Sequence, residues 1–147
     1  MDFISGEILA VDKPLGWTSF DAVKRVRGAI QRRLNMKKFK VGHAGTLDPL
    51  ATGVLIVCTG RATRRIEALQ NGTKEYIATM RLGATTPSFD LETEIDATYP
   101  WQHVTPEQVE AILPQFTGHI LQVPPVYSAV KAVSYTHLRA HETLRHL

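Results

Sequence analysis

The sequence predicts an α+β domain with a mixed, mostly antiparallel sheet and flanking helices. Strand patterns and helix patterns follow each other without the regular βαβ alternation of a parallel sheet. The 147 residues are enough for one domain with a substantial core. The hydrophobic share of 44% and the charged share of 21% are those of an ordinary globular protein.

The first part of the chain is expected to contain two strands and a long helix. Residues 7–11 read as a short strand, and residues 54–59 as an apolar one. Between them a helix begins after Thr18, an expected N-cap, with Asp21 at the N3 position of a capping box. Its expected buried stripe recurs at helical spacing and comprises Phe20, Val23, Val26, Ile30 and Leu34.

After the apolar strand, a short helix is expected to run to about Leu69, and Asn71-Gly72 marks a turn. Residues 74–82 alternate and predict a strand, and residues 83–93 a polar loop. The apolar face of that strand is expected to carry Tyr76, Ala78, Met80 and Leu82.

The last expected elements are a helix and a strand. Thr105 is a predicted N-cap, with Pro106 at N1 and Gln108 at N3. Residues 119–123 predict a final strand. The helix is expected to turn four apolar residues inward, namely Val109, Ile112, Leu113 and Phe116.

Charge is unevenly distributed, although the net charge is only +3. Residues 24–40 contain eight basic side chains and no acid, whereas residues 82–130 contain six acids and no lysine or arginine. Such asymmetry fits a polyanionic partner and equally a solvated helix face. The basic residues are Lys24, Arg25, Arg27, Arg32, Arg33, Lys37, Lys38 and Lys40.

The single cysteine, Cys58, excludes an internal disulfide and a cysteine-based zinc site. We expect it to be buried and inert, because it lies in the apolar strand. No apolar run approaches a membrane span, and the first residues lack a signal-peptide pattern. A cytoplasmic protein that needs no membrane is therefore expected.

The most informative segment is residues 42–53, GHAGTLDPLATG, which hold one carboxylate, Asp48, among glycines, a histidine and Pro49. Gly42 and Gly45 permit tight turns and a close approach of the backbone to a ligand. Such a loop can fix an acid against a flat ligand. Asp48 as a simple turn cap is the alternative, and spacing alone favours it slightly.

Four segments in order resemble TruB-type pseudouridine synthases and together cover nearly all of residues 6–132. Residues 42–53 resemble the catalytic motif of that family. Residues 12–19, DKPLGWTS, resemble its N-terminal motif. Tyr76 together with residues 81–83 resembles the tyrosine strand of the family. Residues 122–131, QVPPVYSAVK, resemble a further segment of the family.

The resemblance implies a role for each matching residue. Asp48 would be the catalytic aspartate, acting as a nucleophile or as a base. Tyr76 would stack on the target uracil close to Asp48, and His43 would contact the space left by the displaced nucleotide. Lys13 would order the site or reach phosphate and Arg64 would contact RNA, although surface solubility explains both equally well.

The reaction implied by the resemblance converts uridine to pseudouridine at position 55, in the T-loop of tRNA. Isomerisation needs no cofactor and no metal, and the target nucleotide must leave the stack of its loop by base flipping. The expected partner is therefore the T-loop and stem of tRNA, and we expect a monomer. A non-catalytic RNA-binding or tRNA-folding module and a guide-RNA-dependent relative acting on ribosomal RNA are the alternatives.

The resemblance stops near residue 132, so residues 1–132 are expected to be the N-terminal part of a catalytic domain. Residues 133–143, VSYTHLRAHET, resemble the translation of a sequencing-library adapter, and residues 133–147 are expected to be a non-native tail. His137 and His141 do not have the spacing of a metalloprotease motif, so no metal site is expected there. The family's site arginine would lie beyond this chain, which is therefore expected to be inactive.

Overall fold

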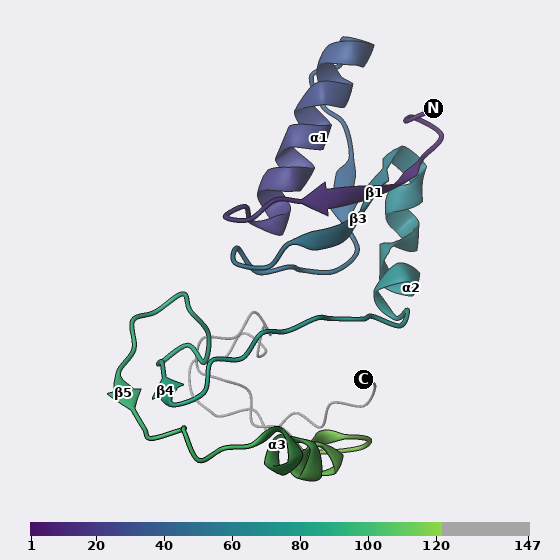
Figure 1. Ribbon diagram of the computed structural model, residues 1–147. Coiled ribbons are helices and arrows are strands. Elements are labelled where there is room, and N and C mark those ends of the chain that lie inside the picture. Colours follow the sequence, from purple (N-terminus) through teal and green to yellow (C-terminus); the bar gives the residue numbers. More distant parts are fainter. Residues whose placement is uncertain (122–147) are drawn as a thin grey trace, which may run out of the picture. The chain divides into compact units, whose positions relative to one another are not determined.

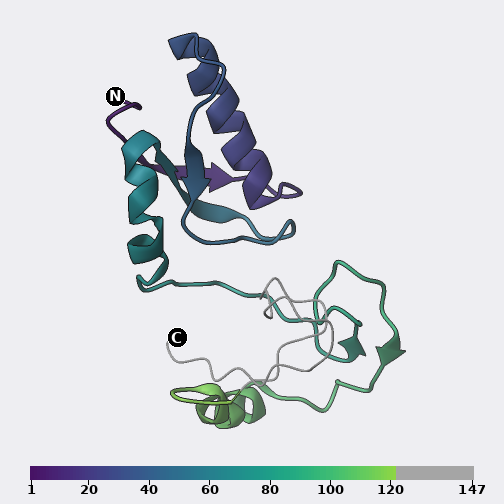
Figure 2. The same ribbon diagram turned by 180° about the vertical axis from the view of Figure 1, so that it is seen from behind.

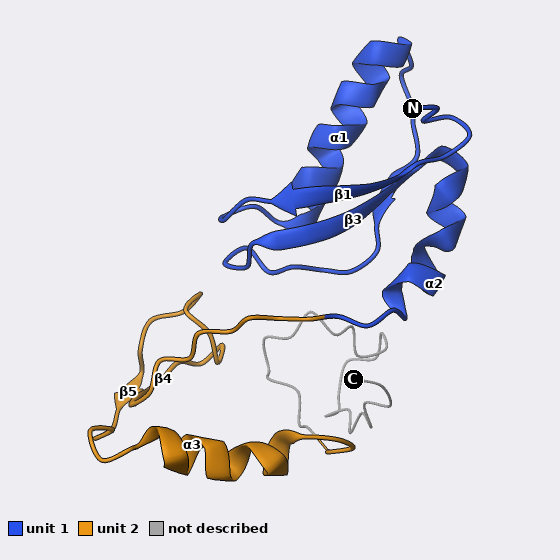
Figure 3. Cartoon of the chain, turned by 45° about the vertical axis from the view of Figure 1, so that its right-hand side comes forward, with its two compact units in different colours: residues 1–74 blue, residues 75–147 orange. Residues whose placement is uncertain are grey.

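The computed structural model describes residues 1–121, and the chain divides into two compact units (Figure 3). Unit 1 is Met1–Lys74, and unit 2 begins at Glu75. Each unit is described by itself below.

Unit 1 is built on a three-stranded antiparallel sheet of β1 (Ile8–Lys13), β2 (Val41–His43) and β3 (Gly53–Thr59). The strand order is β1-β3-β2, so β3 lies in the middle (Figure 1). As the central strand, β3 is hydrogen-bonded along both edges, and its apolar side chains are buried most fully at its end. Val57, Cys58 and Thr59 are fully buried. The antiparallel sheet and its helices confirm the predicted α+β class.

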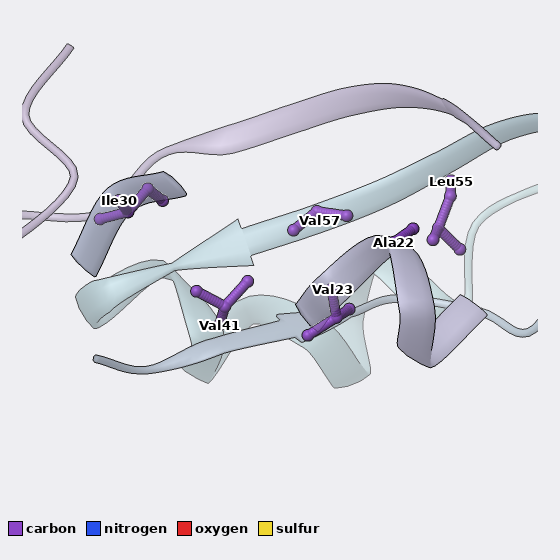
Figure 4. Packing of buried hydrophobic residues seen from close by; sticks show 6 residues of the cluster. All are labelled: Ala22, Val23, Ile30, Val41, Leu55 and Val57. Carbon is purple, nitrogen blue, oxygen red and sulfur yellow. The ribbon is translucent and has the colours of Figure 1, made fainter. Parts of the chain in front are cut away.

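Helix α1 (Ser19–Leu34) packs along one side of this sheet, as the two opposite views show (Figures 1 and 2). The Arg27 side chain joins helix and sheet, since Nη2 donates a hydrogen bond of 3.2 Å to the carbonyl of Val41. The core between them places helix side chains against strand side chains (Figure 4). Its buried members are Ala22, Val23, Ile30, Val41, Leu55 and Val57.

The predicted start of α1 is confirmed as a capping box. Thr18 is the N-cap, and its hydroxyl oxygen accepts from the Asp21 backbone N–H. In return the Asp21 carboxylate accepts from the Thr18 hydroxyl and backbone N–H, and these bonds lower the pKa of Asp21. The helix ends at Asn35, which adopts the left-handed conformation of a C-cap.

The predicted buried stripe of α1 is confirmed in its middle and wrong at its start. Val23 and Ile30 are buried, and Val26 and Leu34 pack against the core. Phe20 is 55% exposed and lies 5.8 Å from the Arg27 guanidinium. One residue corresponds to about 100° around a helix, so the burial of Ser19 turns Phe20 to the side of the core.

Two short helical segments follow β3, namely η1 (Gly60–Arg65) and α2 (Ile66–Gln70), which confirms the helix expected to end near Leu69. The predicted turn after it is confirmed as well, with the Gly72 N–H donating to the carbonyl of Leu69. Burial raises the pKa of the Cys58 thiol, with an opposing influence of Arg65. The expectation of a buried cysteine is therefore confirmed.

Unit 2 has little regular structure in its described residues. A two-stranded antiparallel pair, β4 (Ala84–Thr85) and β5 (Ala97–Thr98), lies where a polar loop was expected to begin. Helix α3 (Pro106–Ile112) continues as η2 (Leu113–Phe116). The predicted capping box of α3 is confirmed, with Thr105 and Gln108 bonded reciprocally.

Three predictions for unit 2 are wrong. Residues 74–82 form no strand, because no described segment pairs with their backbone, and Tyr76 is 66% exposed. Residues 119–121 also form no strand, and the rest of that prediction lies outside the described residues. The face of α3 expected to point inward is mostly exposed, at 47% for Ile112 and 66% for Phe116.

The contribution of the β3 core can be tested with two neighbouring residues. Leu55 is 2% exposed and Val54 is 68% exposed. Leu55→Ala should lower the free energy of unfolding of unit 1 by about 2–5 kcal/mol, because it removes buried contacts and leaves a cavity. Val54→Ala should change it by less than about 0.5 kcal/mol. Hydrogen exchange of the slowest β3 amides measures both, and equal effects would contradict the packing described.

Candidate active site

Asp48 lies in the loop that joins β2 to β3, residues 44–52. The sheet anchors this loop at its start, since the Ala44 N–H donates a hydrogen bond of 2.8 Å to the Ile56 carbonyl. Within the loop, the Ala51 N–H donates to the Asp48 carbonyl at 3.0 Å and closes a turn. The Asp48 side chain is exposed, so its carboxylate is available to a ligand.

The segment after β1 holds the residues on both sides of Asp48. The Gly16 N–H donates to the Pro49 carbonyl at 2.8 Å. The Ser19 hydroxyl accepts from the Leu47 N–H at 2.8 Å and donates to the Leu47 carbonyl at 3.1 Å. Sequence reasoning assigned no role to Ser19 or Gly16, because only the folded chain brings them to the loop.

Lys13 ends β1 and is fully buried. Its ammonium group donates hydrogen bonds to the backbone carbonyls of Trp17 at 2.6 Å and Pro14 at 3.1 Å. Removing an ammonium from water costs several kcal/mol, which these bonds offset in part. Lys13 is therefore no surface residue. It fixes the turn that carries Gly16.

His43 ends β2, directly before the loop, and is half-buried. Its Nδ1 lies within hydrogen-bond reach of the Gly45 carbonyl. Because a carbonyl only accepts, Nδ1 carries the proton in this arrangement. The bond orients the imidazole ring across the start of the loop that holds Asp48.

The two glycines that were expected to shape the loop act in different ways. Gly45 has a φ of +123°, in the region that favours glycine, and a side chain there would have open space around it. Gly42 lies in β2, and an added Cβ would come within 2.8 Å of Ile66 Cδ1. Gly45 is thus needed for the backbone conformation of the loop, whereas Gly42 leaves room for the Ile66 side chain of α2.

Of the remaining predicted site residues, Arg64 lies apart from this loop. Arg64 is exposed on η1, which follows the end of β3 away from the loop (Figure 1). The seven residues of β3 span about 20 Å at the usual rise of a strand. Tyr76 belongs to unit 2, so its approach to Asp48 stays a prediction. The family-like segment 122–131 lies outside the described residues.

The basic run of residues 24–40 forms an exposed surface on α1 and on the segment after it. Seven of its eight basic side chains are exposed, and only Arg27 is half-buried. The Gly60 N–H donates to the Lys40 carbonyl at 2.9 Å, which places the end of the run beside the start of η1. Arg61 and Arg64 therefore extend the positive charge from this end of the run.

Residues 1–121 contain no group of three side chains able to hold a metal ion. In the same part of the chain, no helix is both long and apolar enough to cross a membrane. His137 and His141 lie outside the described residues.

The conformational demand at Gly45 gives a test of the loop. Gly45→Ala should lower the free energy of unfolding by about 1–3 kcal/mol, because alanine is strained at this φ. Gly42→Ala is the matched control and should cost less, because the Ile66 side-chain end can move aside. Urea denaturation compares the two variants, and a larger loss for Gly42→Ala would contradict this account of the loop.

The chain is similar to known proteins of one family. The sequence profile described as "TruB family pseudouridylate synthase (N terminal domain)" matches residues 31–145. The chain is 63% identical over 145 residues to tRNA pseudouridine synthase B of Parabacteroides distasonis, covering 99% of this chain and 60% of the relative. It is 66% identical over 131 residues to tRNA pseudouridine synthase B of Phocaeicola vulgatus, and the match covers 89% of this chain and 56% of that relative.

Two solved structures share the fold. A Cbf5-Nop10-Gar1 complex matches with a TM-score of 0.52 and 29% identity, over 88% of this chain and 32% of the other. An H/ACA ribonucleoprotein bound to a substrate RNA containing 2'-deoxyuridine matches with a TM-score of 0.50 and 26% identity, over 83% and 31%. The chain spans about 60% of the length of the Parabacteroides distasonis relative. It belongs to the TruB family of pseudouridylate synthases and carries the N-terminal domain of that family.

Proposed function

We propose that this chain carries the catalytic loop of a tRNA pseudouridine synthase that isomerises uridine 55 in the T-loop. The observation that carries the proposal is the exposed Asp48, whose neighbours Leu47 and Pro49 are both held by hydrogen bonds. The loop that contains it resembles the catalytic motif of the family. The relatives named tRNA pseudouridine synthase B, 63% and 66% identical, support this substrate class.

The chemistry needs few groups. The bond between the ribose and N1 of uracil breaks, the ring turns, and C5 joins the ribose while the C5 proton leaves and N1 gains one. An ionised carboxylate can attack the ribose or the uracil ring as a nucleophile, or can act as a base. Asp48 is that carboxylate in the proposal. The detached uracil must stay in place, and Tyr76 would hold it by stacking.

RNA would be attracted by the basic surface of residues 24–40 with Arg61 and Arg64. Phosphate contacts by lysine and arginine dominate nucleic-acid affinity and weaken with salt. His43, half-buried beside the loop, would contact the space that the flipped nucleotide leaves. We further propose that the protein acts as a cytoplasmic monomer without metal or cofactor.

Two alternatives remain distinguishable. A guide-RNA-dependent relative would act on ribosomal RNA, but the identities of 29% with the Cbf5-Nop10-Gar1 complex and 26% with the H/ACA ribonucleoprotein are far below the 63% with the tRNA pseudouridine synthase B relative. A non-catalytic RNA-binding module would keep the basic surface and would not depend on the Asp48 carboxylate.

The carboxylate is tested in an extended chain, in which residues 133–147 are replaced by the continuation of the Parabacteroides distasonis relative. Tritium at C5 of uridine in a T-loop RNA is released on isomerisation. Asp48→Asn should lower this release by about 10²–10⁴-fold with RNA affinity retained, because the substitution removes the reacting oxygen's charge.

Glu67→Gln provides the matched control, since it removes an exposed carboxylate on α2 and should leave turnover unchanged. Absence of turnover in the unsubstituted extended chain would overturn the enzyme proposal. Full turnover in Asp48→Asn would overturn the role of Asp48.

The 147-residue chain itself is expected to release no tritium above background. Its segment 74–82 leaves apolar side chains open to solvent, with Ile77 97% and Met80 74% exposed, so the uracil pocket would lack an ordered wall. The same assay, at equal concentrations of the chain and its extended version, checks this. Comparable rates for the two would contradict the expected inactivity of the 147-residue chain.

A further inference from the structure

The Leu47 backbone has no partner in the sheet, because it lies in the loop between β2 and β3. Its N–H and its carbonyl both bond to one side chain, the Ser19 hydroxyl, at 2.8 and 3.1 Å. A hydroxyl offers one donor and two acceptor sites, so it can serve both groups at once. Leu47 packs against the core of unit 1, where unpaired backbone groups would be costly.

Ser19 is itself held rigidly. It is the first residue of α1, directly after the N-cap Thr18, and it is 4% exposed. The capping box between Thr18 and Asp21 fixes the start of the helix from which the Ser19 side chain projects. A group carried by a fixed helix end positions its partner more accurately than a group carried by a loop.

Asp48 lies between two residues whose backbones are held by hydrogen bonds. Ser19 holds Leu47 on one side, and the Gly16 N–H holds the Pro49 carbonyl on the other at 2.8 Å. The turn closed by the Ala51 N–H and the Asp48 carbonyl fixes the Asp48 backbone as well. Rotation of the Asp48 peptide is thereby restricted, while its side chain stays exposed.

We propose that Ser19 is a positioning residue for Asp48, whose hydroxyl sets the backbone of Leu47 and so the direction in which the carboxylate meets the substrate. This inference rests on the proposed function of Asp48. A reacting group displaced by about 1 Å can lose about 10²-fold in rate. Loss of the hydroxyl should therefore affect turnover far more than binding.

The test uses Ser19→Ala in the extended chain, with kcat and KM from tritium release and hydrogen exchange of the Leu47 amide. We expect kcat to fall by about 10–100-fold with KM nearly unchanged. The Leu47 amide should exchange at least about tenfold faster, because its acceptor is gone. Ser19→Thr keeps a hydroxyl and should restore both quantities.

Thr18→Ala is the matched control, since it removes the neighbouring hydroxyl and the helix cap without touching Leu47. It should lower the melting temperature, as the loss of an N-cap does, and should change kcat and Leu47 exchange much less than Ser19→Ala does, because the Ser19 hydroxyl remains. Should Ser19→Ala fail to fold, Ser19→Cys gives the same readout, because a thiol of similar shape bonds only weakly.

Unchanged kcat in Ser19→Ala, or a loss no larger than in Thr18→Ala, would overturn the inference. Failure of the proposed function is recognised separately, because the unsubstituted extended chain would then release no tritium. In that case hydrogen exchange of the Leu47 amide still decides whether Ser19 holds the loop. Faster exchange in Ser19→Ala would support this role of the Ser19 hydroxyl, and unchanged exchange would reject it.

Discussion

The antiparallel register of β1 against β3 is the constraint on which the candidate site depends. It pairs Lys13 with Gly53, so the segment that leaves β1 meets the loop that enters β3, although the two are distant in sequence. Gly16 and Ser19 then reach Pro49 and Leu47. A shift of one residue would turn the buried Lys13 to the other face of the sheet and break these bonds together.

The sequence predicted those parts of the fold whose signals are local. The capping boxes at Thr18 and Thr105 and the apolar strand that became β3 each depend on a few adjacent residues, and each is confirmed. Short strands carry too few residues for a pattern, which is why β2 and β4 were not predicted. Residues 74–82 have the pattern of a strand, but a strand needs a partner that no described segment provides.

The candidate site shows the same division. Asp48 and His43 were predicted as site residues from the composition of one loop and its resemblance to a family motif, which a single sequence can reveal. Ser19 and the burial of Lys13 were not found, because each depends on contacts made only after β1 and β3 pair. A serine after an N-cap looks like an ordinary helix start, and a lysine at the end of a strand looks like a solvent-exposed residue.

Within residues 1–121, the hydrogen bonds that hold the Asp48 loop are made inside unit 1. The bonds that hold Leu47, Pro49 and the Asp48 turn all come from residues 16–51, and the core behind them belongs to α1 and the sheet. The proposed stacking residue, Tyr76, lies in unit 2, whose described apolar side chains are largely exposed. Orientation of the acid and enclosure of the uracil are thus separate structural tasks. Because a detached base escapes unless it is enclosed, an ordered Asp48 loop is necessary for the proposed reaction but not sufficient.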